Sequence, residues 1–323
     1  MGATAPPPDM VSSNFTLNLA YAAFCGETDL MTWTCHWCAG SGANVELLAF
    51  LTNSTAGTQG YVGLDREHGR VIVSFRGSDN MANDIEDGVI ILQTPRNLGH
   101  VPTPSNDDDL STVLVHSGFD FAYGSVRNAT QAAVRSGLDA CGSACNQVLF
   151  TGHSLGAAMT TLAAVDFAAS LAESKYAEDP EKSQAIAATS GSNITIITAL
   201  FTFGSPRVGN TAFAAWAGSI LNGNTSARVT RQGDVVPRIP PNVVPLRDGQ
   251  RYQHVHTEEL WNRHNGTASN DVVGEYDWLV ACMAPNGEDP DCADSEPPAS
   301  LVDPTASGCG QHCNYLGIRG GYC

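Results

Sequence analysis

The sequence predicts an α/β fold with a mostly parallel central sheet and helices on both faces. Short segments at 71–75, 148–151 and 194–203 are typical of buried strands, because apolar, β-branched and aromatic residues dominate them. Helical segments alternate with these strands, and such alternation is typical of a parallel sheet that is covered on both sides. The 323 residues contain no internal repeat and no convincing boundary, so we expect one domain over residues 1–323.

The remaining elements follow from the spacing of apolar residues and from composition. The helices predicted by a period near 3.6 residues cover 14–24, 118–138 and 155–171. A fourth strand is expected at 228–230. Two polar stretches, 175–192 and 285–308, are interpreted as surface loops.

The charge of the chain excludes one large class of partners. Asp and Glu number 33 against 16 Lys and Arg, which gives a net charge of −17. A nucleic-acid partner is therefore not expected, because binding to phosphates requires a basic surface. No uninterrupted apolar run reaches the roughly 18 residues of a membrane-spanning helix, so no transmembrane segment is expected. We interpret the acidic charge as an adaptation to solubility outside the cell.

Cysteines and glycosylation sequons point to an oxidising, secretory route. The chain has ten Cys, and an even number suits disulfides. The Cys35-x-x-Cys38 spacing also fits half of a zinc site, but no second pair lies at the matching spacing, so we expect no metal. Six Asn-x-Ser/Thr sequons begin at Asn14, Asn53, Asn128, Asn193, Asn224 and Asn265.

Residues 152–156 carry the clearest chemical signal, because they read G-x-S-x-G. This motif requires a strand before it and a helix after it, and the predicted elements provide both. The sharp turn holds the central Ser154 in a strained conformation, and the flanking glycines avoid clashes. The spacing therefore predicts that Ser154 is a nucleophile at the N-terminus of a helix.

A nucleophilic serine needs a base and an acid that orients the base. In this arrangement the acid and then the base follow the serine along the chain. Asp234 suits the acid, because it follows the predicted strand at 228–230 in a turn. The residues alone leave four candidates for the base: His254, His256, His264 and His312.

Several ordered segments resemble one known family, the class 3 lipases of filamentous-fungal type, within the α/β-hydrolase superfamily. These segments are S-F-R-G-S at 74–78, V-H-S-G-F at 115–119, T-G-H-S-L-G-A-A at 151–158, F-G-S-P-R-V-G-N at 203–210, D-V-V-P-R-I-P-P at 234–241 and H-C-N-Y-L at 312–316. The resemblance implies an α/β-hydrolase fold with a nucleophile elbow and a lid.

The resemblance also assigns roles to individual residues. Its H-x-x-Y segment implies that His312 is the base, while Asp234 matches the acid and Ser154 the nucleophile. The oxyanion hole would use Ser78 and Leu155. The resemblance implies disulfides that join Cys25 to Cys323, Cys35 to Cys38 and Cys282 to Cys292. The four remaining cysteines then suggest the pairs Cys141–Cys145 and Cys309–Cys313.

A lid is implied directly after the oxyanion strand, at 79–88. An Asp replaces the Trp that many family members carry there, and acidic residues outnumber apolar ones. A lid of this composition buries little apolar area at an oil surface, which argues against strong interfacial activation. The lid positions of interest are Asp79, Met81, Asn83, Asp84, Ile85 and Asp87.

These observations predict a secreted, monomeric serine ester hydrolase that needs no cofactor. A lipase that cleaves acylglycerols is the first interpretation, with a lipid–water interface as one place of action. A lipase selective for mono- and diacylglycerols and a feruloyl-type esterase are the alternatives within the same chemistry. A catalytically inactive binding module on a hydrolase scaffold is the alternative from a different class.

Overall fold

The computed structural model is described here for residues 10–78, 92–93, 95–99, 101, 112–176, 195–221, 226–242, 251–255, 257–264, 277–282, 287–295 and 310–323. The helices are α1 Met10–Ala22, α2 Glu27–Thr32, α3 His36–Gly40, α5 Ser117–Gly124, α6 Arg127–Cys141, α7 Leu155–Tyr176 and α9 Thr211–Ile220. Short 3-10 helices lie at η1 Gly142–Ala144, η2 Val236–Arg238, η4 Ala293–Ser295 and η5 Gly310–Cys313.

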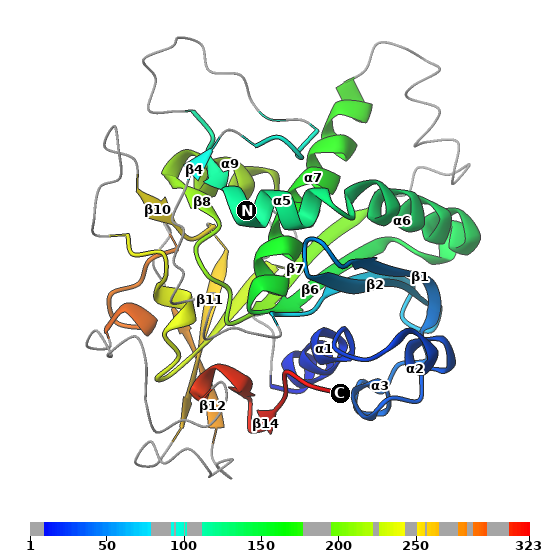
Figure 1. Cartoon of the computed structure of the whole chain (residues 1–323), viewed down its shortest axis with the longest axis horizontal. Helices are drawn as coiled ribbons and strands as arrows, with labels where there is room; N and C mark the ends of the chain where they lie inside the picture. The colour runs from blue at the N-terminus through cyan, green and yellow to red at the C-terminus, as the bar shows by residue number, and fades with distance from the viewer. Residues whose placement is uncertain are drawn as a thin grey trace.

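An eight-stranded sheet forms the centre of the molecule, in the order β1-β2-β3-β6-β7-β9-β11-β12 (Figure 1). Its strands are β1 Glu46–Asn53, β2 Thr58–Asp65, β3 Arg70–Phe75, β6 Gln147–His153, β7 Ile197–Phe203, β9 Ser226–Arg231, β11 Glu258–His264 and β12 Asp277–Cys282. The pairings from β3 through β6, β7 and β9 to β11 are parallel. The prediction of a mostly parallel sheet is therefore confirmed.

The outer strands are not among the segments that the sequence predicts. At one edge β1 and β2 form an antiparallel hairpin next to β3, and at the other edge β12 pairs antiparallel with β11. A four-stranded sheet in the order β10-β8-β5-β4 and a two-stranded sheet of β13 and β14 complete the strands. These short strands are β4 Leu92–Gln93, β5 Val115–His116, β8 Gly209–Asn210, β10 Tyr252–Gln253, β13 Asn314–Tyr315 and β14 Ile318–Arg319.

The single long helix expected at 118–138 is wrong, because the structure divides this region into α5 and α6. The backbone of Val126 leaves the helical region, with φ −126° and ψ 0°. The Ser125 hydroxyl caps the end of α5 by donating to the Ala122 carbonyl at 2.7 Å. Arg127 then starts α6 and pairs with Asp166 of α7, with 2.7 Å between Nε and Oδ2. Apolar spacing alone did not reveal this break.

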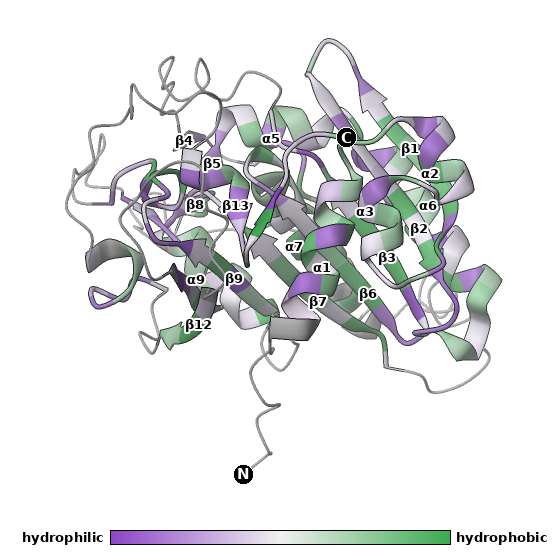
Figure 2. Cartoon of the chain, turned by 90° about the horizontal axis from the view of Figure 1, so that it is seen from below, coloured by the Kyte–Doolittle hydropathy of each residue, from purple (hydrophilic) through white to green (hydrophobic). Residues whose placement is uncertain are grey.

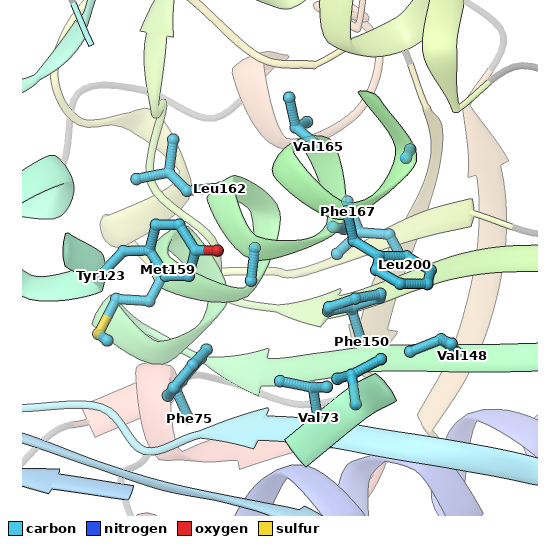
Figure 3. Close-up of a cluster of buried hydrophobic side chains, with 14 of the residues drawn as sticks. Val73, Phe75, Tyr123, Val148, Phe150, Met159, Leu162, Val165, Phe167 and Leu200 are labelled. Atoms are coloured by element: carbon cyan, nitrogen blue, oxygen red, sulfur yellow. The ribbon is translucent and has the colours of Figure 1, made fainter. Parts of the chain in front are cut away.

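Alternate residues of the central strands face opposite sides of the sheet, and each side has its own core. Val71 and Val73 of β3 belong to the core beneath α5, α6 and α7, part of which Figure 3 shows. Ile72, between them, belongs to the core beneath α1 and α3. Figure 2 shows α1 lying along the face formed by β6 and β7. Both faces are therefore covered, as the apolar strands predict.

Helix α7 is the one helix within the described ranges that is long and apolar enough to cross a membrane. Its stretch Leu155–Ala172 has a mean hydropathy of 1.5, and 78% of this stretch is buried inside the fold. The helix packs on β3, β6 and β7. A buried helix of this kind is typical of a protein core, and its composition follows from that position.

Four disulfides join Cys25 to Cys323, Cys35 to Cys38, Cys141 to Cys145 and Cys282 to Cys292. Three of these are the pairs that the family resemblance implies, and Cys141–Cys145 is one of the pairs suggested by the cysteines that remained. Cys313 is disulfide-bonded as well, and its expected partner Cys309 lies outside the described residues. The Cys35-x-x-Cys38 spacing thus carries a disulfide rather than half of a zinc site.

Three of the six sequon asparagines belong to the described residues. Asn53 ends β1, and its Oδ1 accepts a hydrogen bond from the Ala56 N–H at 3.1 Å. Asn128 is exposed in the first turn of α6, whereas Oδ1 of Asn14 in α1 is buried. The other three, Asn193, Asn224 and Asn265, lie outside the described residues.

Candidate active site

Ser154 occupies the turn between β6 and α7 in a strained backbone conformation. Its φ of 62° lies in the left-handed region, which non-glycine residues seldom adopt. The Ser154 N–H donates to the Phe203 carbonyl of β7 at 3.0 Å, and the Ser154 carbonyl accepts from the Ala157 N–H at 2.9 Å. The neighbouring strand and the first turn of α7 therefore hold the serine from both sides.

Glycines surround Ser154 because the backbone approaches too closely for side chains. A Cβ on Gly156 would collide with the Phe75 carbonyl at the end of β3, and a Cβ on Gly152 would lie 2.6 Å from the Gly156 carbonyl. A Cβ on Gly77 would lie 3.0 Å from the Ser154 Cβ. The segment after β3, which includes Ser78, thus runs directly against the serine, and Leu155 begins α7 beside it.

Asp234 follows β9 as expected and is almost completely buried. Its Oδ2 accepts hydrogen bonds from His312 Nδ1 at 2.7 Å and from the Tyr315 hydroxyl at 2.5 Å. Its Oδ1 accepts from the Val236 N–H at 2.9 Å. Burial alone would raise the pKa of this carboxyl, but the charge of His312 and these hydrogen bonds outweigh burial and lower the pKa. The carboxylate is therefore ionised at neutral pH.

His312 lies in η5 with both ring nitrogens buried in distinct surroundings. Nδ1 donates its hydrogen to Asp234, which leaves Nε2 of the neutral ring as a hydrogen-bond acceptor. Nε2 is buried and has no hydrogen-bond partner among the residues that the structure describes. An imidazole held in this tautomer can accept a proton at Nε2.

Gly204 connects the serine with the Asp–His pair. It follows Phe203, whose carbonyl holds the Ser154 N–H, and its φ is 59°. A Cβ on Gly204 would lie 2.8 Å from His312 Cε1 and 3.1 Å from Asp234 Oδ2. The backbone contact of Ser154 and the pair His312–Asp234 therefore meet around one glycine, and the structure brings the three predicted residues together.

A buried ion pair supports the loop that follows Asp234. The side chain of Arg207, 1% exposed, pairs with Glu288 at 2.8–2.9 Å through two hydrogen bonds. Arg207 Nη1 also donates to the carbonyls of Arg238 at 2.6 Å and Pro240 at 3.1 Å, in the loop after the acid. Glu288 belongs to the acidic 285–308 loop, which thereby acquires a structural role in its described part.

Several of these residues have no role that their sequence pattern predicts. Tyr315 stands in the H-x-x-Y segment, and its distance of three residues from His312 was the available signal. Gly204 and Arg207 stand in the F-G-S-P-R segment at 203–207. Their roles depend on contacts with residues far along the chain, such as Glu288, and spacing along one segment does not reveal such contacts.

Of the other histidine candidates, His254 is the one whose side chain belongs to the described residues, and it contacts a different group. His254 is buried, and its Nε2 lies 2.6 Å from the Pro237 carbonyl. Burial and the neighbouring arginines lower the pKa of His254 well below its usual value, although Glu288 opposes this. The ring of His264 and the whole of His256 lie outside the described residues, as do the lid positions Asp79, Met81, Asn83, Asp84, Ile85 and Asp87.

Comparison with known proteins relates this arrangement to lipases. A family model described as lipase (class 3) matches residues 72–244, more than half of the 323-residue chain. A secreted mono- and diacylglycerol lipase 1 from Fusarium solani is 32% identical over 251 residues, which are 76% of this chain and 63% of that relative. A lipase from Rhizomucor miehei is 28% identical over 90% of this chain and 64% of its own length. The chain thus spans less than two thirds of the length of both relatives.

Solved structures share the fold. Lipase II from Rhizopus niveus superposes with a TM-score of 0.67 at 23% identity, covering 97% of this chain and 96% of that one. Lip2 lipase from Yarrowia lipolytica gives a TM-score of 0.65 at 21% identity, covering 96% and 94%. The family model covers more than half of the chain and includes both the serine elbow and Asp234. The chain therefore belongs to the class 3 lipase family.

Proposed function

We propose that the chain is a serine ester hydrolase that cleaves acylglycerols. One observation carries the proposal: Asp234 holds His312 through a 2.7 Å hydrogen bond to Nδ1, next to a serine in a strained strand–helix turn. A serine, an imidazole of fixed tautomer and an ionised carboxylate are what acyl transfer through a covalent intermediate requires.

In the first half of the proposed reaction the Ser154 hydroxyl attacks the ester carbonyl carbon. His312 takes the serine proton at Nε2, and the carboxylate of Asp234 stabilises the imidazolium that forms. His312 then gives that proton to the departing alcohol, which leaves an acyl group on Ser154. In the second half a water molecule attacks the acyl carbonyl carbon while His312 takes a proton from it. The bond between that carbon and Ser154 Oγ then breaks, the acid leaves, and His312 returns the proton to the serine.

The negative charge on the substrate oxygen requires donors at the elbow. The backbone N–H of Leu155 at the start of α7 and that of Ser78 after β3 are the proposed donors, with the Ser78 hydroxyl as a further one. The close approach of Gly77 to the Ser154 Cβ, 3.0 Å for a Cβ built on the glycine, supports this assignment. The loss of one such donor typically lowers kcat by about 10²–10³-fold.

Mono- and diacylglycerols are the substrates that one further observation favours. The relative from Fusarium solani is named a mono- and diacylglycerol lipase, and it is 32% identical to this chain. The polar composition of residues 79–88 agrees with substrates more water-soluble than triacylglycerols. The disulfides support a secreted protein. We further propose that it acts as a monomer of one domain and meets its substrate at a lipid–water interface.

The decisive experiment compares wild type with Ser154→Ala on emulsified diolein, triolein and soluble methyl ferulate. We expect Ser154→Ala to lower kcat by about 10⁶-fold, as in other serine hydrolases. A serine-directed phosphonate should label wild type and fail to label the variant. Ser170→Ala, which changes a serine at the other end of α7, is the control and should keep full activity.

The outcomes of this experiment separate the competing functions. Most activity remaining in Ser154→Ala would reject the proposed nucleophile. No labelling and no hydrolysis by wild type would indicate a binding module on a hydrolase scaffold. Preference for methyl ferulate over both glycerides would indicate an aromatic-ester hydrolase, and preference for triolein over diolein would contradict the proposed glyceride class.

A further inference from the structure

The residue before the serine makes a direct contact with the main chain of the proposed base. His153 is fully buried at the end of β6, and its Nε2 lies 2.6 Å from the carbonyl oxygen of His312. A carbonyl oxygen can only accept, so Nε2 of His153 carries the hydrogen. The two rings also pack together, with centroids 4.5 Å apart and planes at 37°.

His153 is a neutral ring in this position. Burial and then the charge of His312 lower its pKa to about 3, although the hydrogen bond to the His312 carbonyl and the charge of Asp234 oppose this. The Nδ1 atom is buried and has no hydrogen-bond partner among the described residues. A neutral, enclosed ring of this kind cannot exchange protons with the substrate, so its contribution must come through His312.

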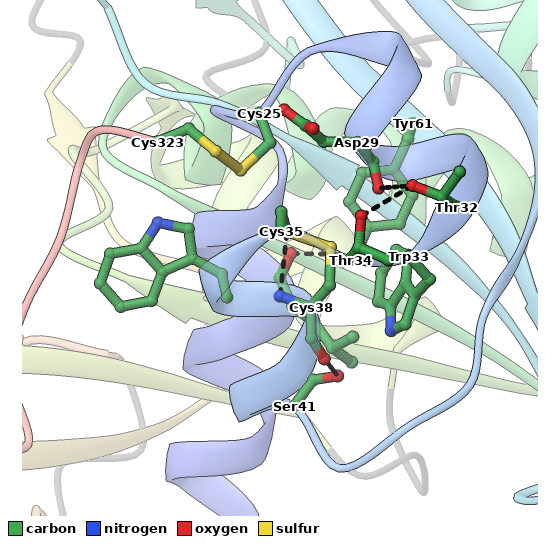
Figure 4. Close-up of a disulfide and its surroundings, with 12 residues drawn as sticks. Cys25, Asp29, Thr32, Trp33, Thr34, Cys35, Cys38, Ser41, Tyr61 and Cys323 are labelled. Carbon is green, nitrogen blue, oxygen red and sulfur yellow. Dashed lines mark hydrogen bonds between the residues drawn. A yellow bond between two sulfur atoms is a disulfide. The ribbon is translucent and has the colours of Figure 1, made fainter.

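The N-terminal helix supports the same stretch of main chain from the other side. Tyr21 of α1 donates from its hydroxyl to the Cys313 carbonyl at 3.3 Å, and its ring packs on His153 with centroids 5.4 Å apart. The Cys25–Cys323 disulfide, drawn in Figure 4, links the end of this helical region to the segment that follows His312. Trp37 adds a 2.6 Å hydrogen bond from Nε1 to the Tyr322 carbonyl.

We infer that His153 is a positioning residue that sets the place of His312 relative to Ser154, with Tyr21 as its weaker partner. One peptide segment carries both the nucleophile and the donor that holds the backbone of the base. The side chain of His153 thereby ties the backbone of His312 in η5 to the end of β6, which Ser154 directly follows. This inference rests on the proposed function.

Such a role affects the chemical step more than substrate binding. His153 is 0% exposed and lies below Ser154, so its loss removes no contact with the substrate. A displacement of a reacting group by about 1 Å can lower the rate by about 10²-fold. The expected signature is therefore a lower kcat with an unchanged KM.

The test uses two amide side chains of different length at position 153. In His153→Gln the terminal amide nitrogen reaches the place of Nε2 and can still donate to the His312 carbonyl. In His153→Asn the amide is too short and stands near the place of Nδ1. We expect His153→Asn to lower kcat by about 10–10²-fold with KM within about twofold, and His153→Gln to recover all but about threefold.

Phosphonate labelling of Ser154 gives an independent readout, because it depends on proton transfer to His312 but not on glyceride binding. Its rate should fall by the same factor as kcat in His153→Asn. Tyr21→Phe, which keeps the ring and removes only the 3.3 Å hydrogen bond, should lower kcat by about two- to fivefold.

Three results would overturn the inference. They are equal kcat values for the Asn and Gln variants, an effect confined to KM, or a His153→Asn enzyme that labels as fast as wild type. Thermal unfolding of each variant confirms folding, and if the Asn variant does not fold, Tyr21→Phe still tests the inference, because a wild-type kcat and labelling rate in that variant would overturn it. A failure of the proposed function is recognised separately, because either Ser154→Ala would remain active or wild type would show neither hydrolysis nor labelling.

Discussion

The two halves of the candidate active site are held by different means. Ser154 is held by backbone contacts, namely its hydrogen bonds to Phe203 and Ala157 and the tight approach around Gly156. The half that carries Asp234 and His312 is held by buried side chains from distant segments.

This difference determines where each half is vulnerable. The serine half depends on the absence of side chains, so that adding atoms damages it. The Asp–His half depends on charged and polar groups that satisfy one another, so that removing one group leaves another buried without a partner. The following predictions test this contrast, from the largest expected effect to the smallest.

Removing the guanidinium of Arg207 should have the largest effect on stability. Arg207→Met removes the cation that pairs with Glu288 and removes one donor from each of two carbonyls in the loop after Asp234. Breaking a buried ion pair in this way typically lowers the free energy of unfolding by about 3–5 kcal/mol. Urea unfolding would measure the change.

The matched control for this variant is an exposed ion pair. Arg66 and Glu46 lie 3.4 Å apart with side chains 54% and 59% exposed, and such pairs contribute about 0–1 kcal/mol. Arg66→Met should therefore unfold close to wild type. Equal losses for the two variants would mean that burial of the Arg207 pair has no special importance.

Adding one methyl group at Gly204, where the two halves meet, should displace His312 without removing any polar group. A Cβ there would lie 2.8 Å from His312 Cε1 and 2.9 Å from the Tyr315 hydroxyl oxygen. We expect Gly204→Ala to lower kcat by about 10²-fold, since the base must move.

Gly57→Ala is the control that distinguishes the effect of this steric contact from the effect of backbone strain. Gly57 has φ 63°, close to the 59° of Gly204, but nothing lies within 4 Å of its Cβ position. Both variants should lose a similar amount of stability from the left-handed backbone, while only Gly204→Ala should lose activity. A steady-state assay that finds equal kcat values in the two would disprove the close contact.

The smallest effect concerns stability in acid. The pKa of His153 is lowered by burial to about 3, and burial also lowers that of His254, whereas an unfolded histidine titrates near 6.5. At pH values between the folded and the unfolded pKa, the unfolded chain binds more protons than the folded chain. The free energy of unfolding therefore falls as pH falls. Each histidine contributes a slope of about 1.4 kcal/mol per pH unit.

Urea unfolding at pH 7, 6 and 5 would measure this slope. Replacing either histidine by Gln should remove its contribution to the slope, about 1.4 kcal/mol per pH unit. Replacing the exposed His36 by Gln is the control for the loss of an imidazole. The lowered pKa of Asp234 acts in a separate window, because its stabilisation is lost only as pH falls below about 4. Unchanged slopes in both variants would contradict the neutral, buried state of the two rings.

The sequence predicted the serine half of the site better than the other half for a physical reason. Residues 152–156 specify a strand, a turn and a helix that are adjacent in the chain, so local spacing carries the whole signal. The Asp–His half depends on the pairing of Arg207 with Glu288 and of Tyr315 with Asp234, both across long separations. The break between α5 and α6 was missed for a similar reason, since the pairing of Arg127 with Asp166 acts from another helix.

The buried strands were predictable because apolar runs report burial on both faces. The antiparallel outer strands were not predictable in this way. The burial of β1 is uneven, and β2 is buried although its sequence T-Q-G-Y-V-G-L-D is no apolar run, so pairing partners decide the conformation there and in β12. The placement of Ser154, Asp234 and His312 follows from the resemblance of the segments around them.

The left-handed backbone at Ser154 also bears on how such a protein changes over generations. A conformation of this kind costs a non-glycine residue roughly 1–3 kcal/mol, and glycine would adopt it with little strain. A descendant that lost the need to hydrolyse esters could therefore gain stability by mutating this one position. Only continued selection for hydrolysis would retain the serine, so inactive descendants of such a fold are expected to lose it early.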